Sequence, residues 1–382
     1  MSTVTLSAMD NNNSKQCILC GRCLEVCPLF RVTGREELSP RGKGFLLEKF
    51  RELDLRVKSV VELARLCAGC RRCVQTCPQK LDLPLEIARL KSHHPDWKAW
   101  IWSRLIKSGH GFIPLIKGAA AIIPETAPVL KHASRSKASV SPLLKIKPEK
   151  FNAAGRAVVF PGCAGMHFHP ELEKKAARML QIMGYEVLET PKWQCCGYPL
   201  GSAGLFEQEQ RELKKNLETW QATGRPQVFV FCATCLDGLK NSFSLFDGHP
   251  HLDSFRQSVR HLLTDTARLA FEAGRVDGQK TLLWHEPCHG TGSSGAVIKE
   301  IFKASGLEIV LSDKKCCGMG GSFAVQNPDL SRMIADDFWQ SIPGSGKILV
   351  LTDCSGCVLQ LEATRPDHAQ VAHWLEIIGL PV

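Results

Sequence analysis

Two short runs near the N-terminus carry eight cysteines at the spacing C-x2-C-x2-C-x3-C-P. CILCGRCLEVCP occupies residues 17–28, and CAGCRRCVQTCP occupies residues 67–78. Three thiolates two residues apart can surround one corner of a cubic [4Fe–4S] cluster, whereas the fourth cysteine lies too far along to complete the same cube. Structural zinc sites instead use two separated pairs. The runs therefore predict two cubane clusters with crossed ligands, one held by Cys17, Cys20, Cys23 and Cys77, and the other by Cys67, Cys70, Cys73 and Cys27.

The remaining cysteines form two groups of five with the pattern C…CCG…C-x2-C. Two adjacent cysteines can rarely both reach one small ion, but they can serve different irons of a cluster. The glycine after each pair allows a close backbone approach. The pattern favours a five-thiolate iron–sulfur site, with zinc on four of the five thiolates, or a redox-active thiol pair, as alternatives. The first group is Cys163, Cys195, Cys196, Cys232 and Cys235, and the second is Cys288, Cys316, Cys317, Cys354 and Cys357.

An internal repeat must position these two groups. Cys163 and Cys288 are 125 residues apart, and the later cysteines of the two groups keep nearly the same separation. In each copy an apolar strand leads to the first cysteine, and a helix and a second strand lead to the CCG motif. Another helix and a third strand lead to the C-x2-C pair. This alternation predicts two small α/β units with mainly parallel sheets, whose strand ends gather the cysteines at one edge.

The expected organisation has four parts. Residues 1–96 are predicted to form a mostly helical ferredoxin-like domain, and residues 97–150 an amphipathic segment followed by a basic, solvated linker. The first CCG domain is expected over residues 151–278 and the second over 279–382. No apolar run reaches membrane-spanning length, and the polar N-terminus lacks a signal sequence. We therefore expect a cytoplasmic protein, with a peripheral position at the inner face of the cell membrane as the alternative.

Charge is unevenly distributed along the chain. Residues 1–150 contain 26 Lys and Arg against 13 Asp and Glu, whereas residues 151–382 contain 22 against 25. An oxidised [4Fe–4S] cluster with four thiolates carries a charge of about −2. The basic excess therefore either compensates buried clusters or attracts an acidic docking partner. We expect no nucleic-acid partner.

The order of these motifs resembles the CCG-domain iron–sulfur oxidoreductase family. That family includes the heterodisulfide reductase catalytic subunit, the C subunit of anaerobic glycerol-3-phosphate dehydrogenase, and the iron–sulfur subunit of glycolate oxidase and related D-lactate dehydrogenases. CCGMGGSFAVQNPDLSRMI and HWLEIIG are most similar to the glycolate oxidase subunit. GCAGMHFHPELEKKA, CCGYPL and LTDCSGC are closer to the glycerol-3-phosphate subunit. The resemblance implies one or two noncubane [4Fe–4S] clusters at the groups of five cysteines.

The function implied by the resemblance is that of an iron–sulfur electron-transfer subunit in a flavin-dependent glycolate or D-lactate dehydrogenase complex. An FAD-containing partner would oxidise the substrate, and electrons would continue to a quinone or another membrane carrier. We expect no flavin on this chain and assign no catalytic residue. Because the chain keeps Cys232 and Cys354, a heterodisulfide-reductase-like catalyst stays open, as does the glycerol-3-phosphate subunit. His285 and His289 flank Cys288. We expect them either to contact the cluster ligands or relay protons, or to have a structural role alone.

Overall fold

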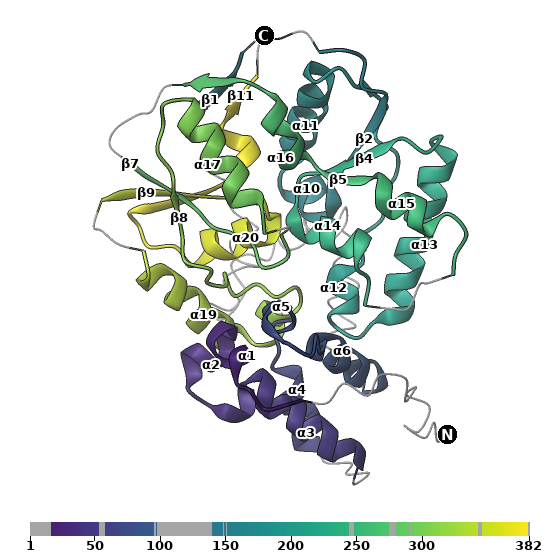
Figure 1. Cartoon of the computed structure of the whole chain (residues 1–382), viewed down its shortest axis with the longest axis vertical. Helices are drawn as coiled ribbons and strands as arrows, with labels where there is room; N and C mark the ends of the chain where they lie inside the picture. Colours follow the sequence, from purple (N-terminus) through teal and green to yellow (C-terminus); the bar gives the residue numbers. More distant parts are fainter. Residues whose placement is uncertain are drawn as a thin grey trace.

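The computed structural model describes residues 17–52, 58–94, 97, 140–147, 149, 151–243, 248–274, 280–290, 292–342 and 346–380. The amphipathic segment expected after residue 97 lies almost wholly outside these residues. Three parts of the chain are visible in Figure 1: a helical N-terminal part below, and two α/β units side by side above it. None of the described helices has the length and hydropathy needed to cross a membrane.

The N-terminal part is built from short helices, and its described residues contain no strand. Its elements are α1 (Arg22–Val26), α2 (Pro28–Thr33), η2 (Glu36–Leu38), α3 (Pro40–Glu52), α4 (Lys58–Arg65), α5 (Arg72–Thr76) and α6 (Leu83–His93). Each cysteine run forms one helical turn, α1 or α5. Both turns begin after a residue with positive φ, Gly21 at 77° and Arg71 at 56°. Both end at an extended cysteine, because the following proline disfavours helical backbone at Cys27 and Cys77.

The first α/β unit contains a four-stranded parallel sheet in the order β3-β2-β4-β5. Its strands are β2 (Arg156–Phe160), β3 (Glu186–Val187), β4 (Gln227–Val230) and β5 (Val259–His261). Its helices are α10 (Gly162–Phe168), α11 (Pro170–Ile182), α12 (Tyr198–Gly201), α13 (Phe206–Ala222), α14 (Ala233–Lys240), α15 (Leu252–Ser258) and α16 (Leu262–Asp265), with the turn η3 (Thr266–Arg268). Four consecutive residues of β2 are buried, as expected for a parallel strand covered on both faces.

The second unit repeats this architecture with the order β8-β7-β9-β10, again entirely parallel. Its strands are β7 (Lys280–Trp284), β8 (Val310–Leu311), β9 (Lys347–Thr352) and β10 (Ala369–His373). Its helices are α17 (Ser294–Ala304), α18 (Phe323–Gln326), α19 (Pro328–Gln340) and α20 (Ser355–Thr364), with the turn η4 (Trp374–Ile377). The predicted fold class, a helical ferredoxin-like domain followed by tandem α/β CCG repeats with parallel sheets, is confirmed.

A third, smaller sheet was not expected from the sequence. It joins β1 (Leu144–Ile146) to β6 (Phe271–Ala273) and to β11 (Ile378–Gly379). Leu144 and Ile146 are buried, so the prediction of a solvated linker is wrong for this stretch. The reason is tertiary: three short segments, each with too few residues to form a stable strand alone, pair across both units.

The two units share one hydrophobic core that extends from β2 and β4 across to β7 and β9. The N-terminal part packs beneath both units. Tyr198 donates to the Gly69 carbonyl at 2.9 Å, Lys91 Nζ donates to the Ser202 carbonyl at 3.1 Å, and Arg72 Nη2 donates to the Lys315 carbonyl at 3.0 Å. These contacts fix the position of the helical part against the carboxyl ends of both sheets.

Candidate metal centres

The eight N-terminal cysteines gather in the two helical turns and the loops beside them. Burial is the largest cause that raises the pKa of Cys23, and the neighbouring Cys17 and Cys20 raise it further. Burial likewise raises the pKa of Cys73 well above its ordinary value, followed by the effects of Cys70, Cys67 and Cys27. Cys27, from the first run, therefore lies among thiols of the second run. Cys77 ends α5, which packs beside α1. This is the arrangement that crossed ligation requires, and the ligand assignment itself stays a prediction.

Serine substitutions would test the crossing. Cys27→Ser is expected to abolish or alter the cubane cluster that lies near Cys70, whereas Cys77→Ser should affect the other one. The two variants are distinguishable by EPR, because the Cys70 cluster lies next to the second CCG group and should show spin coupling to it. Loss of this coupling in Cys77→Ser, with retention in Cys27→Ser, would contradict the crossed assignment.

A buried lysine lies beside the second N-terminal cluster site. Lys43, in the first turn of α3, is 3% exposed, and its Nζ donates to the carbonyl oxygens of Leu38 at 2.8 Å and Leu66 at 2.7 Å. Desolvation lowers the pKa of Lys43, opposed by the nearby cysteines 67, 27, 73 and 70. A cation at this place offsets the negative charge of thiolates. Part of the basic excess of residues 1–150 is therefore local charge compensation.

The first group of five cysteines forms a continuous series of contacts in the first α/β unit. Cys163 lies in α10, directly after β2, and its thiol hydrogen-bonds to Cys195. Cys196 contacts both Cys195 and Cys235, and these hydrogen bonds lower the pKa of Cys196 to about 6. Cys235, in α14, in turn contacts Cys232. The sheet edge thus collects all five thiols, as parallel strand topology predicts.

The second group repeats this series. Cys288 contacts Cys316, and Cys316 contacts Cys317. The Sγ atoms of Cys317 and Cys357 are 3.2 Å apart, and Cys357 also contacts Cys354. Cys232 and Cys354 occupy equivalent places, as the residues that precede α14 and α20.

The two groups meet, which sequence reasoning did not predict. The thiols of Cys232 and Cys354 hydrogen-bond to each other, and the backbone N–H of Ala233 donates to the Asp353 carbonyl at 2.9 Å. The ten thiols of the two units therefore form one continuous series of contacts. A repeat in the sequence shows that two similar sites exist, but it contains no signal for how closely the units pack.

The donor set fits iron–sulfur clusters. All eighteen cysteines are free, and eight of the ten in the two CCG groups are buried. A zinc ion takes four ligands in structural sites, so it would leave one thiol of each group without a metal partner. A cluster with several irons can use all five. The described residues beside these groups supply thiols and imidazoles, which are ligands that suit iron–sulfur and zinc sites rather than magnesium or calcium.

Glycines allow the thiols to approach. Gly162 has φ 68°, and a Cβ built there would lie 2.5 Å from the Cys235 Sγ. We predict that Gly162→Ala displaces Cys235 and lowers iron content at the first CCG site while the other sites keep theirs. Gly155→Ala is the matched control, because Gly155 also has positive φ, 94°, but a Cβ at that position would have no atom within 4 Å. Equal iron content in both variants, measured by metal analysis and EPR, would show that Cys235 is not needed there.

The N-terminal part reaches the second group through Cys70 and Arg72. Burial is the largest cause that raises the pKa of Cys70 to about 12, and Cys316 is the next. Arg72 donates to the carbonyl oxygens of Lys314 and Lys315, just before the CCG motif. Burial lowers the pKa of Arg72, but the thiols of Cys316, Cys288 and Cys70 raise it above its ordinary value. The guanidinium therefore lies between a predicted cubane site and the second CCG site.

A polar cleft of about 500 Å³ opens beside Cys288. Its walls come from the helical part and from both α/β units, and they include Arg71, Asp82, Asp237, Lys240, Arg256 and His289. Asp237 Oδ2 is buried there and makes no hydrogen bond with the described residues. His289 stacks on Tyr198, with 4.3 Å between ring centroids. The cleft could admit a small polar molecule to one thiol of the second group, a feature that sequence spacing cannot reveal.

Two protein-family models match the chain. The 4Fe-4S dicluster domain matches residues 13–81, and the cysteine-rich domain named CCG matches residues 157–240 and 282–362. The domain order in the sequence is thus one dicluster domain followed by two cysteine-rich domains. Together the two models cover more than half of the chain.

Curated relatives align along almost the whole chain. The glycolate oxidase iron-sulfur subunit of Escherichia coli (strain K12) is 25% identical, over 95% of this chain and 93% of its own length. The C subunit of anaerobic glycerol-3-phosphate dehydrogenase from the same organism is 25% identical, over 93% of this chain and 95% of its own length. The D subunit of the dihydromethanophenazine:CoB–CoM heterodisulfide reductase of Methanosarcina barkeri is 25% identical, over 96% of this chain and 92% of its own length. The resemblance inferred from the motifs is confirmed, and the chain belongs to the CCG-domain iron–sulfur oxidoreductase family.

Proposed function

We propose that this chain is the iron–sulfur electron-transfer subunit of a flavin-dependent 2-hydroxy-acid dehydrogenase complex, acting on glycolate or D-lactate. An FAD-containing partner would oxidise the substrate, and the electrons would continue towards a quinone or another carrier. Iron–sulfur clusters, when bound, supply one-electron acceptors with tunable potentials. The observation that carries the proposal is the continuous line of thiols from Cys70 through Cys316 to the Cys232–Cys354 contact.

The chain's own residues would set the environment of that line. Most thiols of the two CCG groups are buried away from water. Lys43 stabilises negative charge within the helical part, and Arg72 does so where the helical part meets the second α/β unit. Both effects control how readily an electron is accepted at each position.

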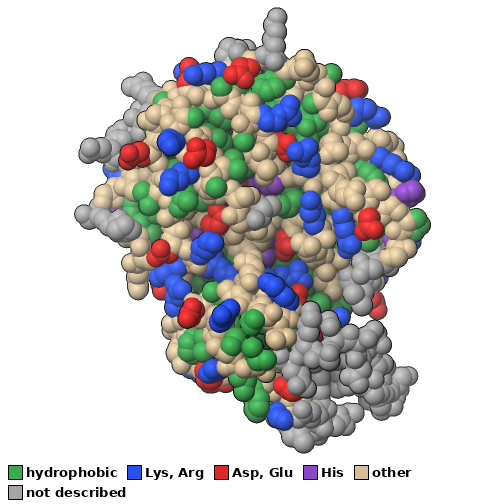
Figure 2. Space-filling model, in the orientation of Figure 1, with side chains coloured by type: hydrophobic (Ala, Val, Ile, Leu, Met, Phe, Trp, Pro, Cys, Tyr) green, Lys and Arg blue, Asp and Glu red, His purple; other side chains and the backbone are tan. Residues whose placement is uncertain are grey.

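The exposed end of this series of thiols lies in the helical part. Cys20 is exposed, and its neighbours Ile18 and Leu19 are 58% and 56% exposed. In Figure 2, hydrophobic side chains also appear at the surface over the lower part of the molecule, where Figure 1 shows the N-terminal helices. An electron donor that docks here would reach the first predicted cubane site, and this supports a flavoprotein partner on this face.

Affinity purification of the full chain from its native host, under anaerobic conditions, would test the proposal. We expect an FAD-containing subunit to co-purify, and deletion of the chain to abolish glycolate or D-lactate oxidation with a membrane acceptor. Oxidation of glycerol 3-phosphate should be measured in the same strains, because it is the alternative substrate. The absence of any flavoprotein partner, together with unchanged dehydrogenase activity in the deletion strain, would contradict the proposal.

A second candidate function is reduction of a disulfide, and the cleft beside Cys288 favours it. Both groups keep all five cysteines, and a small disulfide entering the cleft would meet a thiol of the second group. Anaerobically reduced protein should then consume a low-molecular-weight disulfide with a stoichiometric release of two thiols. No turnover of any such disulfide by protein with a full iron content would exclude this candidate.

A further inference from the structure

The two units differ at one residue that borders the thiols. Phe160 lies three residues before Cys163, and His285 lies three residues before Cys288. The strand registers agree with this equivalence. Phe160 pairs with Val230, two residues before Cys232, and His285 follows the pairing of Trp284 with Leu351, so it lies beside Thr352, two residues before Cys354. An imidazole in the second unit therefore replaces a benzyl ring in the first.

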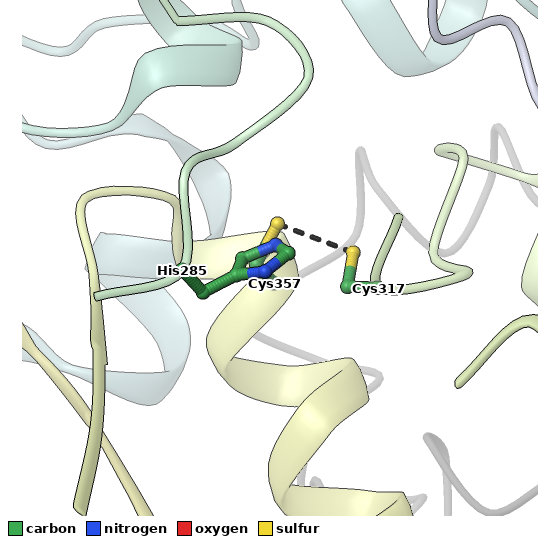
Figure 3. Close-up of side chains that lie close together, drawn as sticks. All are labelled: His285, Cys317 and Cys357. Atoms are coloured by element: carbon green, nitrogen blue, oxygen red, sulfur yellow. Dashed lines mark hydrogen bonds between the residues drawn. The ribbon is translucent and has the colours of Figure 1, made fainter. Parts of the chain in front are cut away.

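The His285 ring points at two thiols of the second group. A ring nitrogen of His285 and the Sγ atoms of Cys317 and Cys357 all lie within 4.8 Å of one another, and all three residues are buried. Figure 3 shows the imidazole, which comes from the end of β7, beside Cys357 at the start of α20 and facing Cys317. The equivalent thiols in the first unit are Cys196 and Cys235, and there Phe160 offers no donor atom.

The surroundings hold the ring in place without using its Nδ1 atom. His285 is 1% exposed, its backbone N–H donates to the Leu351 carbonyl at 2.8 Å, and its ring packs edge-on against Phe338 at 4.9 Å. Nδ1 is buried and makes no hydrogen bond with the described residues. A buried ring nitrogen without a partner is costly, and a metal ligand is one use that would remove this cost.

We propose that His285 is a sixth protein ligand of the second CCG site, donating a ring nitrogen to an iron that Cys317 or Cys357 also binds. The inference rests on iron occupying this site, and not on the identity of the substrate or the flavoprotein partner. A neutral imidazole carries a lone pair on one ring nitrogen, which is the form in which histidine binds metals.

Imidazole ligation would make the two CCG sites unequal. The second group would bind iron through five thiols and one neutral nitrogen, whereas the first group offers five thiols and, at the equivalent place, the benzyl ring of Phe160. Iron in the two units would therefore differ in coordination and in reduction potential, because ligand identity sets the potential of iron–sulfur centres. The second unit is also the one beside Cys70, the thiol through which the helical part reaches the CCG groups.

Pulsed EPR on the anaerobically purified full chain, labelled with ¹⁵N-histidine, tests the proposal. In the paramagnetic state of the second site, we expect the strong hyperfine coupling of a directly bound histidine nitrogen. His285→Phe, which installs the residue of the first unit, should lose this coupling and change the reduction potential of the second site. His289→Phe is the matched control, since it removes the other histidine beside Cys288 and should keep the coupling.

The possible outcomes distinguish the proposal for His285 from the prediction that the second site binds a cluster. A coupling that is unchanged in His285→Phe, or only the weak coupling of a hydrogen-bonded histidine in the wild-type protein, with iron present at the second site, would overturn the proposal for His285 alone. Iron-free second sites would overturn it together with the predicted cluster. If His285→Phe does not fold, the labelled wild-type protein still decides between strong and weak coupling.

Discussion

Removal of iron should unfold the N-terminal helices and leave the two α/β units folded. The buried apolar cluster within the helical part is small and consists of Leu47, Val61, Ala64, Ile87 and Leu90. The α/β pair, by contrast, shares one extensive core. A helical domain of this size lacks the apolar burial needed to fold alone, so its cluster ligands must supply the difference. Structural zinc in zinc-finger peptides contributes about 10–16 kcal/mol of binding free energy, and we expect the helical part to lose a contribution of this kind with its iron.

Hydrogen exchange before and after anaerobic chelation would measure this effect. Amides of α4 and α6 should lose nearly all protection, while those of β4 and β9 should keep theirs. Reconstitution with iron and sulfide should restore the original pattern, which controls for irreversible damage. Persistent protection of α4 and α6 in iron-free protein would show that the hydrogen bonds to Ser202, Gly69 and Lys315 suffice to fold the helical part without clusters.

Arg72→Met should lower the reduction potentials of the predicted clusters at Cys70 and at Cys316. Arg72 is half-buried between these thiols, and its positive charge stabilises whichever neighbouring centre gains an electron. Two charged hydrogen bonds to the carbonyl oxygens of Lys314 and Lys315 would also be lost. Because charged hydrogen bonds contribute about 1.5–3 kcal/mol each when buried, and Arg72 is partly exposed, we expect a loss of about 2 kcal/mol in unfolding free energy.

The chain offers a matched control for this variant. Arg22 precedes Cys23 in the first run as Arg72 precedes Cys73 in the second, but Arg22 is exposed. Redox titration should show little change in Arg22→Met and a negative shift of two centres in Arg72→Met. Arg72→Lys should recover most of the potential, because the charge is kept, but less of the stability, because the forked geometry is lost. Equal potentials in Arg72→Met and wild type would refute a role for this guanidinium in electron transfer.

Sequence spacing predicted the two groups of five cysteines that the structure brings together, but not the positions of these groups relative to one another. Strand and helix order followed from the repeated pattern around Cys163 and Cys288, since buried parallel strands leave a strong apolar signal. The contact of Cys232 with Cys354 could not be predicted, because it depends on packing between the units. Arg72 and Lys43 appeared in the sequence only as part of a general basic excess.

Two further features needed tertiary information for different reasons. The strand at Leu144–Ile146 lies in a Pro- and Lys-rich stretch without periodicity, and it forms because β6 and β11 are nearby to pair with it. The proposed role of His285 had a sequence signal, namely its alignment with Phe160 in the repeat. The alignment alone does not suggest a metal ligand. Only the structure shows that the ring lies beside Cys317 and Cys357.

Iron, sulfide and zinc analysis of strictly anaerobic protein, with Mössbauer and EPR spectroscopy, tests the central claim most directly. Two cubane and two noncubane clusters would give about sixteen iron atoms per chain, with acid-labile sulfide and a brown colour. Spectra should resolve two cluster types, with coupling between the second N-terminal cluster and a CCG cluster. A colourless protein that contains zinc alone would contradict the account that its eighteen cysteines bind iron–sulfur clusters.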